Sequence, residues 1–353
     1  MFLLDSHCDT PSHILRLRDL AVDNKYSHVD FPKLCRGGVD GAFFALYTPA
    51  SLNEADSYIY AYKLLDGVRN VLNLHDGKAK MATTRAEAYA NKADGLFSVF
   101  LGLENGQALG GSLERIEEFY EAGIRYITLC HSKNNQICDS CAEGNGWNGL
   151  SPFGKDVVRT MNRMRMLVDV SHISDASFYD VLETSDRPVV ATHSCCRALC
   201  SHPRNMTDDM IRHLAEADGV IQVNFYPLFL DDSFKAELEQ SGIMEYGEQI
   251  ESEFIADPGN EQKRSAWNKV QDELMSLKRP SFKLIADHID HIVDLVGIDH
   301  VGIGSDFDGI EVTPDGMEDI SHMPALFDEL RSRGYTQADL EKIASDNFFR
   351  ILC

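Results

Sequence analysis

Two short apolar stretches decide the fold: Val168-Asp169-Val170-Ser171-His172 and Val189-Val190-Ala191-Thr192-His193. Their final histidines are 21 residues apart, and residues 173–188 between them have the pattern of one amphipathic helix. This predicts a strand–helix–strand unit with a histidine at the C-terminal end of each of two parallel strands. Either histidine alone would be explained well enough as an ordinary strand-end residue. As a pair on one face they are natural metal ligands.

The rest of the chain repeats the same alternation of short apolar strands and helices. Strands are predicted at residues 2–8, 41–47, 96–103, 125–130, 168–172, 189–193, 219–225 and 300–305, and helices at 56–73, 152–165, 281–296, 317–333 and 337–352, among others. Such alternation is typical of the α/β class and predicts a (β/α)₈ TIM barrel, whose active face lies at the C-terminal ends of its strands.

One segment does not fit the alternation. Residues 231–280 are highly charged and helical in pattern. We interpret them as a helical insertion between strand seven and its helix, too short and too polar to have a core of its own. Residues 1–353 are therefore expected to form a single domain.

Composition excludes some classes of partner. The net charge of −23 argues against nucleic acid and against an anionic membrane surface. No apolar run approaches the roughly 20 residues that span a bilayer, and Met1 to Asp5 has no basic region. The nine cysteines are spaced like reduced thiols rather than a disulfide framework. We expect a cytoplasmic protein without a membrane partner.

Cys138-Asp139-Ser140-Cys141 is a CxxC motif. It could be a redox pair or half of a zinc ribbon, but no second CxxC completes a four-cysteine site. We therefore favour two free thiols in an irregular loop.

Histidines and carboxylates recur at the predicted strand ends: His7, Asp9, Glu104, His131, His172, His193 and Asp306. Alternation along a strand places His7 and Asp9 on the same side. Glu104 could be a ligand or a helix N-cap, because Asn105-Gly106 follows it. Imidazole with carboxylate suits Zn²⁺, with Mn²⁺, Co²⁺ or Fe²⁺ as alternatives. The set exceeds the needs of one four-coordinate ion, and a central carboxylate can bridge two.

The combination of motifs resembles the renal (membrane) dipeptidases of the amidohydrolase superfamily. The matching segments are 5–10 (DSHCDT), 102–106 (GLENG), 129–131 (LCH), 149–154 (GLSPFG), 167–172 (LVDVSH), 193–194 (HS), 204–205 (RN) and 302–309 (GIGSDFDG). They are spread over essentially the whole chain. The resemblance implies a zinc-dependent hydrolase that cleaves dipeptides, including those with a C-terminal D-residue, by a zinc-bridging hydroxide.

The resemblance also implies roles for the residues that match. His7 and Asp9 would bind the first of two zinc ions, His172 and His193 the second, and Glu104 would bridge them. His131 would face the substrate and its developing oxyanion. Arg204 would bind the substrate's carboxylate, and Asp306 would transfer the proton.

Some features differ from that family. Arg165 stands where a glycine is common, and a left-handed turn there would cost about 1 kcal/mol. Asp308 is explained as the acid of an Asp-Gly turn and is left out of the predicted site. No hydrophobic tail follows Cys353, so no lipid anchor is expected.

Two other functions compete with a dipeptidase. Another hydrolase of the superfamily, a deaminase or lactonase, would usually carry HxH on the first strand, whereas this chain has HxD at His7 and Asp9. A non-catalytic metal-binding barrel would be expected to lack Glu104, Asp306 or Arg204. The preferred dipeptide, the native metal and whether the chain forms a homodimer stay open.

Overall fold

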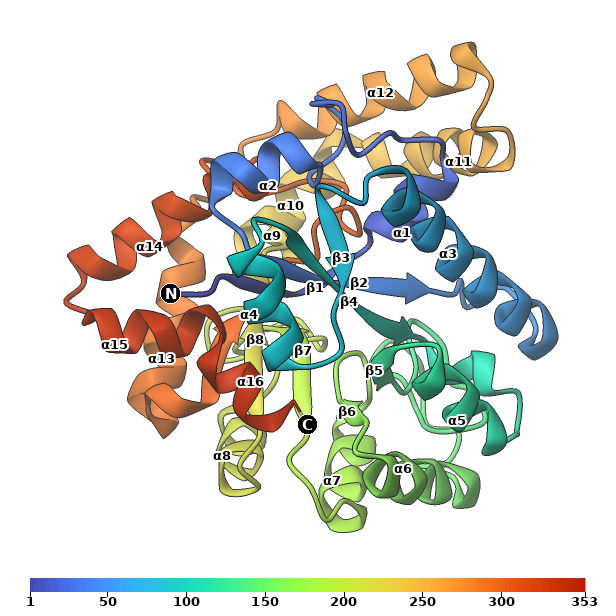
Figure 1. Ribbon diagram of the computed structural model, residues 1–353, viewed down its shortest axis with the longest axis vertical. Helices are drawn as coiled ribbons and strands as arrows, with labels where there is room; N and C mark the ends of the chain where they lie inside the picture. Colours follow the sequence, from blue (N-terminus) through green and yellow to red (C-terminus); the bar gives the residue numbers. More distant parts are fainter. Residues whose placement is uncertain (353) are drawn as a thin grey trace.

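The chain forms a parallel barrel in the computed structural model, which describes residues 1–352 (Figure 1). Neighbouring strands pair in parallel in the order β1-β2-β4-β5-β6-β7-β8-β9. Their bounds are β1 Leu4–Cys8, β2 Gly41–Tyr47, β4 Phe97–Glu104, β5 Ile124–Thr128, β6 Leu167–Asp169, β7 Val190–Ser194, β8 Val220–Val223 and β9 Val301–Ile303. The predicted (β/α)₈ barrel is confirmed.

The seam between β9 and β1 is closed by a few specific hydrogen bonds instead of a regular ladder. The Asp9 amide donates to the Phe307 carbonyl at 2.8 Å, and the Asp306 amide donates to the His7 carbonyl at 3.0 Å. Below them, the buried Asp5 carboxylate accepts the Ser305 amide at 2.9 Å. These bonds bring the first and last predicted site segments side by side.

The barrel interior is filled by large side chains. All eight residues of β4 are buried, as expected for a strand covered on both faces. A Cβ at Gly102 would lie 2.1 Å from the ring of Tyr126, so only glycine leaves room for this buried tyrosine. At the N-terminal end of the barrel, the rings of Phe43 and Phe348 pack 5.0 Å apart. The C-terminal helix therefore closes the end of the barrel opposite to the predicted site.

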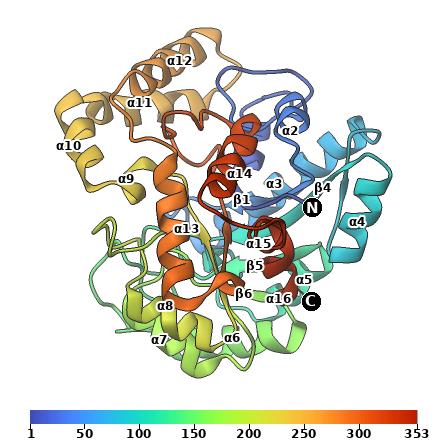
Figure 2. The ribbon, with the colours of Figure 1, turned by 90° about the vertical axis from the view of Figure 1, so that its left-hand side faces the viewer.

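Helices surround the barrel (Figures 1 and 2). The α-helices are α1 Thr10–Leu15, α2 Phe31–Gly37, α3 Glu54–Leu74, α4 Arg85–Ala93, α5 Glu114–Glu121, α6 Pro152–Met164, α7 Asp175–Thr184, α8 Asp208–Glu216, α9 Pro227–Leu230, α10 Asp232–Ser241, α11 Ile243–Ala256, α12 Glu261–Met275, α13 Lys283–Val296, α14 Met323–Ser332, α15 Gln337–Glu341 and α16 Asn347–Ile351. None of the helices within residues 1–352 combines the length and apolar character that crossing a bilayer requires.

Helices α10 to α12 form the predicted insertion, residues 231–280, between β8 and α13, and the short helix α9 precedes them. The expectation that this segment has no core of its own is wrong. Its apolar side chains form a separate buried cluster, made of Phe234, Leu238, Ile243, Phe254, Trp267, Val270 and Leu274 together with Val312 from the loop after β9. The amphipathic helices pair with one another, and this hides their apolar faces despite the high overall charge of the segment.

Other differences from the predicted elements are local. The short strand β3, Ala79–Met81, pairs in parallel with β4 outside the barrel path and was not predicted. The helix expected at 317–333 begins only at Met323, after a 3₁₀ turn at Ile320–His322. The helix expected at 337–352 contains a π-helical turn at Lys342–Asp346.

The left-handed turn expected at Arg165 is present. Arg165 caps α6 with φ 59° and ψ 31°, and its amide donates to the carbonyls of Met161 and Asn162. A side chain with a Cβ is strained in this conformation, where glycine is not.

We expect Arg165→Gly to raise the free energy of unfolding by about 0.5–1 kcal/mol, because glycine removes the strain but has a more flexible unfolded state. Urea denaturation of both proteins measures the difference. Arg163→Gly, two residues earlier and inside the helix, should have the opposite sign and destabilise by about 1 kcal/mol. Destabilisation by both changes would show that the turn is unstrained.

Candidate metal centre and active site

The predicted site residues come together at the C-terminal ends of the strands. His7 lies near the end of β1 with Asp9 just beyond the strand, and Glu104 ends β4. His131, His172 and Asp306 follow β5, β6 and β9, and His193 lies in β7. Among the described residues, three groups of side chains could each hold a metal ion, because the ligand atoms within a group lie within 4.8 Å of one another. The groups are His7, Glu104 and His193; Glu104, His131 and His172; and His7, Asp9 and Asp306.

Glu104 occupies the centre of the cluster, and its two oxygens contact different histidines. Its Oε2 lies 3.4 Å from His7 Nε2, while its Oε1 lies 3.2 Å from His172 Nε2 and 3.7 Å from His193 Nε2. The following 3₁₀ helix takes Asn105 as its N-cap, so the alternative of an N-cap role for Glu104 is wrong. One carboxylate that faces two sets of nitrogens has the arrangement of a bridge between two cations.

A chain of hydrogen bonds fixes the tautomer of His193. Thr192 Oγ1 donates to Asp169 Oδ2 at 2.7 Å and lies 2.8 Å from His193 Nδ1. Because the hydroxyl proton points to Asp169, Thr192 Oγ1 accepts the Nδ1 proton, and Nε2 keeps its lone pair. The Thr128 hydroxyl donates to the same carboxylate and holds it from β5.

His7 is oriented in a similar way from the barrel interior. Its Nδ1 lies 2.9 Å from the Tyr126 hydroxyl. Its Nε2 is buried without a hydrogen-bond partner, as is Oδ1 of Asp9, while Asp9 Oδ2 lies 3.4 Å from His7 Nε2. Buried polar atoms without partners are costly, and here they face one another as ligand atoms around a cation would.

The charge of the cluster also suits metal ions. Burial lowers the pKa of His172 and His193 well below the ordinary value, so both imidazoles are neutral, as metal ligands must be. Burial also acts to lower the pKa of His7, but the Glu104 and Asp9 carboxylates outweigh it and raise this pKa well above the ordinary value. A divalent ion beside these carboxylates would displace the proton of His7, so this set of donors fits divalent ions.

Asp306 sits beside the cluster in a strained left-handed conformation, with φ 65°. Its Oδ1 lies 3.8 Å from His7 Nε2, and its Oδ2 accepts the side-chain amide of Asn224 at 2.9 Å. Burial raises the pKa of Asp306 to about 7, with Asp9 adding to the rise. Asn224, fully buried after β8, was not predicted, because an asparagine at a strand end carries no recognisable signal.

His131 and Arg204 lie on the β5–β7 side. His131 Nε2 is 3.7 Å from Glu104 Oε1, its Nδ1 is buried without a partner, and burial lowers its pKa to about 3. Arg204 is 6% exposed, its Nη2 donates to the His193 carbonyl at 2.7 Å and its Nε has no partner. Arg204 stands behind His193 and outside the set of residues that line the cavity.

Asp308 has a larger role than the turn acid expected from sequence. It is buried and accepts the Thr10 hydroxyl at 2.8 Å and the His28 amide at 2.6 Å, while its own amide donates to His28 Nδ1. Since Thr10 follows Asp9, these bonds tie the first strand end to the last. A Cβ at Gly309 would lie 2.2 Å from Asp9 Oδ2, so this loop packs directly on a predicted ligand.

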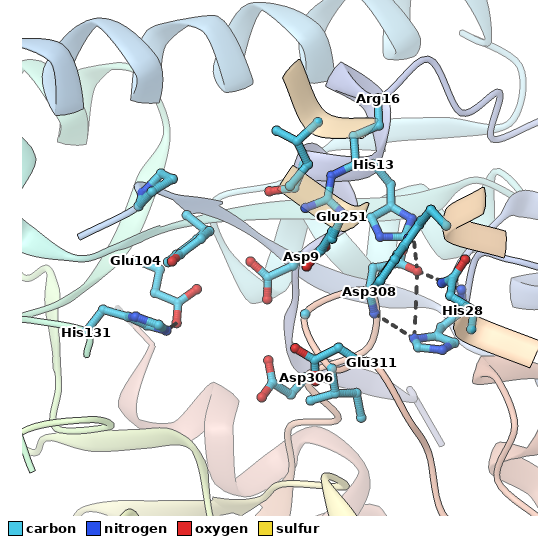
Figure 3. Close-up of a pocket in the computed structure, with 18 of the residues that line it drawn as sticks. Asp9, His13, Arg16, His28, Glu104, His131, Glu251, Asp306, Asp308 and Glu311 are labelled. Carbon is cyan, nitrogen blue, oxygen red and sulfur yellow. Dashed lines mark hydrogen bonds and ion pairs between the residues drawn. The ribbon is translucent and has the colours of Figure 1, made fainter. Parts of the chain in front are cut away.

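A cavity of about 380 Å³ opens in front of the cluster (Figure 3). Asp9, Glu104, His131, His172 and Asp306 line its inner end. The outer wall contains residues from α1, the insertion helices and the loop after β9, among them Arg16, Glu251, Trp267, Gln271 and Glu311. The insertion therefore contributes directly to the site.

The CxxC loop lies beside this face. Cys138 is buried, Cys141 is half-buried, and both are free thiols, as favoured from the sequence. The loop is held by Asp139, whose carboxylate accepts the backbone amides of Trp147 and Asn148 at 2.9 and 2.7 Å.

We expect Thr192→Val to weaken zinc binding by roughly 10–100-fold, because the substitution keeps the side-chain volume but removes the acceptor for His193 Nδ1. Competition with a chromogenic chelator measures the affinity. Thr313→Val, at a threonine that is also fully buried but lies outside the ligand cluster, is the matched control. Equal affinity of the Thr192 variant and the wild type would mean that the tautomer of His193 is fixed by other contacts.

Comparison with known proteins agrees with this geometry. The family model of the membrane dipeptidases, peptidase family M19, matches residues 1–353. The dipeptidase aclJ of Aspergillus oryzae is 31% identical over 350 residues, which cover 97% of this chain and 73% of that protein. An uncharacterized dipeptidase of Schizosaccharomyces pombe, C3A11.10c, is 29% identical over 377 residues, covering 99% of this chain and 80% of that protein.

Solved structures are similar over the whole chain. The metallopeptidase dipeptidase AC of family M19 has a TM-score of 0.82 at 26% identity, covering 100% of this chain and 98% of that one. A metallopeptidase from Rhodobacter sphaeroides, bound to a phosphinate mimic of the dipeptide L-Ala-D-Ala, has a TM-score of 0.81 at 25% identity with the same coverage. The chain therefore belongs to the membrane dipeptidase family, peptidase family M19, and is a metallo-dipeptidase.

Proposed function

We propose that the chain hydrolyses dipeptides with two divalent ions, zinc in the first instance, held by His7, Asp9, Glu104, His172 and His193. The observation that carries the proposal is the central carboxylate of Glu104, with one oxygen toward His7 and the other toward His172 and His193. When bound, such a pair of ions supplies Lewis-acid chemistry, polarising the scissile carbonyl and activating water. Imidazole and carboxylate ligands favour Zn²⁺, and Mn²⁺, Co²⁺ or Fe²⁺ would fit the same set.

The other site residues then have distinct tasks. Asp306, whose burial raises its pKa to about 7, takes a proton at its carboxylate and passes it to the leaving amine. His131, which lines the cavity beside Glu104, donates a hydrogen bond to the developing oxyanion. Arg204 binds the C-terminal carboxylate of the substrate through its guanidinium group, whose buried Nε has no hydrogen-bond partner among the described residues.

The proposal includes dipeptides with a C-terminal D-residue, since the similar Rhodobacter sphaeroides enzyme binds a mimic of L-Ala-D-Ala. We further propose that residues 1–353 act as one domain in which the insertion completes the site. A cytoplasmic location would be consistent with the eight free cysteines among the described residues. A homodimer stays a prediction.

The metal centre is tested by Glu104→Gln. Because an amide offers one neutral oxygen in place of two charged ones, we expect the variant to lose at least one of two ions per chain. Elemental analysis of both proteins measures the stoichiometry. Glu117→Gln, at an exposed acid of α5, should keep two ions. Full occupancy in the Glu104 variant would contradict the bridging role.

The dipeptidase role of Arg204 is tested with free and amidated substrates. Charged hydrogen bonds are worth about 1.5–3 kcal/mol, so Arg204→Ala should lower kcat/KM on a dipeptide roughly 10–100-fold. A dipeptide amide lacks the carboxylate, so it should be a poor substrate for the wild type and be affected little by the change. Arg204→Lys should restore activity only in part, because lysine lacks the planar fork.

The same measurement separates a structural role from a binding role. Arg204 also donates to the His193 carbonyl, so its removal could disturb a metal ligand. In that case the free and the amidated substrate would lose activity equally, and the proposed carboxylate contact would be refuted.

A further inference from the structure

The outer wall of the cavity is rich in hydrogen-bond acceptors and poor in donors. Glu251 comes from α11, Gln271 from α12 and Glu311 from the loop after β9, and all three line the cavity. Arg16 is the only arginine or lysine among the described residues that line it. Figure 3 shows Glu251 and Glu311 entering the same space from two sides, with Asp9 and Asp306 farther in.

The charges on this wall do not balance. Arg16 Nη1 lies 3.1 Å from Glu251 Oε1 and so compensates one carboxylate. His13 and His28 add no positive charge, because burial lowers the pKa of His13 to about 4 and also lowers that of His28. None of the described residues that line the cavity therefore offers Glu311 a cationic partner. Its side chain instead contacts the Tyr226 hydroxyl, which donates to it.

The position of Glu311 is unfavourable for a carboxylate in the absence of a ligand. Burial raises the pKa of Glu311 to about 7, and the nearby Glu251 charge is the next largest cause. A cation placed between the two carboxylates would offset both the loss of hydration and the repulsion.

A second and independent observation comes from Gln271. Its Oε1 is buried and has no hydrogen-bond partner, although the side chain lines the cavity. A buried acceptor without a donor costs free energy unless a ligand supplies the donor. Ammonium and guanidinium groups carry several donors and no acceptor, which complements a wall of two carboxylates and one amide oxygen.

The direction of a bound dipeptide follows from the proposed function, on which this step rests. Arg204, which donates to the His193 carbonyl on the β5–β7 side, would take the C-terminal carboxylate. The N-terminal residue then extends past Asp9 and Asp306 toward the outer wall. We propose that Glu251 and Glu311, with Gln271, form a subsite that selects dipeptides whose N-terminal residue has a basic side chain.

The test compares two substrates that differ by one charged group, Lys-Ala and norleucyl-Ala, and includes Glu-Ala as a substrate of the opposite charge. We expect the zinc-loaded wild type to have a kcat/KM about tenfold or more higher for Lys-Ala than for norleucyl-Ala, because only the lysine side chain can donate charge-assisted hydrogen bonds to the subsite. Glu311→Gln and Glu251→Gln should each reduce this preference by about three- to tenfold. Glu253→Gln, at an exposed acid of the same helix α11, is the matched control and should keep the preference.

Each other outcome has a definite meaning. Equal rates on the two substrates in the wild type, or equal losses on both in the glutamine variants, would overturn the subsite while leaving the dipeptidase intact. A higher kcat/KM for Glu-Ala than for both other substrates would mean that Arg16 binds the side chain of the N-terminal residue, and this result would also overturn the proposed subsite. Hydrolysis of none of these dipeptides by the zinc-loaded enzyme would overturn the proposed function itself.

Discussion

The site depends on the burial of several carboxylates close to one another. Asp9 and Glu104 are 5% and 3% exposed, and Asp306 lies beside them, while His172 and His193 bring no positive charge because their pKa is lowered. Buried charges of one sign are unstable unless cations balance them. This arrangement is the one expected of residues that surround cations. The hydroxyl groups of Thr192 and Tyr126 contact the Nδ1 atoms of His193 and His7 and add no charge to the cluster.

The close placement of these carboxylates makes the seam between β1 and β9 important. The first and last strands do not form a regular ladder, yet they carry His7, Asp9 and Asp306, which must be placed accurately relative to one another. Asp308 achieves this by accepting from Thr10, next to Asp9, and from the His28 amide. Side-chain hydrogen bonds thus close the barrel at the C-terminal ends of β1 and β9, where the candidate site lies. The backbone hydrogen bonds of an ordinary strand pair would not orient side chains in this way.

The strand-end histidines could be predicted because parallel strands place their C-terminal ends on one face. His172 and His193 follow from this rule without knowledge of the tertiary contacts. Asn224 and Asp308 could not be predicted, because their partners are 82 and 280 or more residues away in sequence. The hydrophobic cluster of the insertion was missed for a related reason. Its helices are polar on average, and only their mutual packing shows that the apolar positions meet.

One residue in particular, Trp267, links the packing of the insertion to the shape of the cavity. Trp267 is 5% exposed and belongs to the apolar cluster of α10 to α12, but it also lines the cavity. The packing of the insertion therefore sets the shape of the outer wall of the cavity, while the strand ends set the positions of the proposed metal ligands. Val312, which follows Glu311, anchors this cluster to the loop after β9. Since that loop also contains Asp306, the outer wall and the group proposed to transfer the proton are held by one continuous segment. A change in the packing of α12 would therefore alter the outer wall, whereas the proposed ligands at the ends of β4, β6 and β7 are held by the barrel itself.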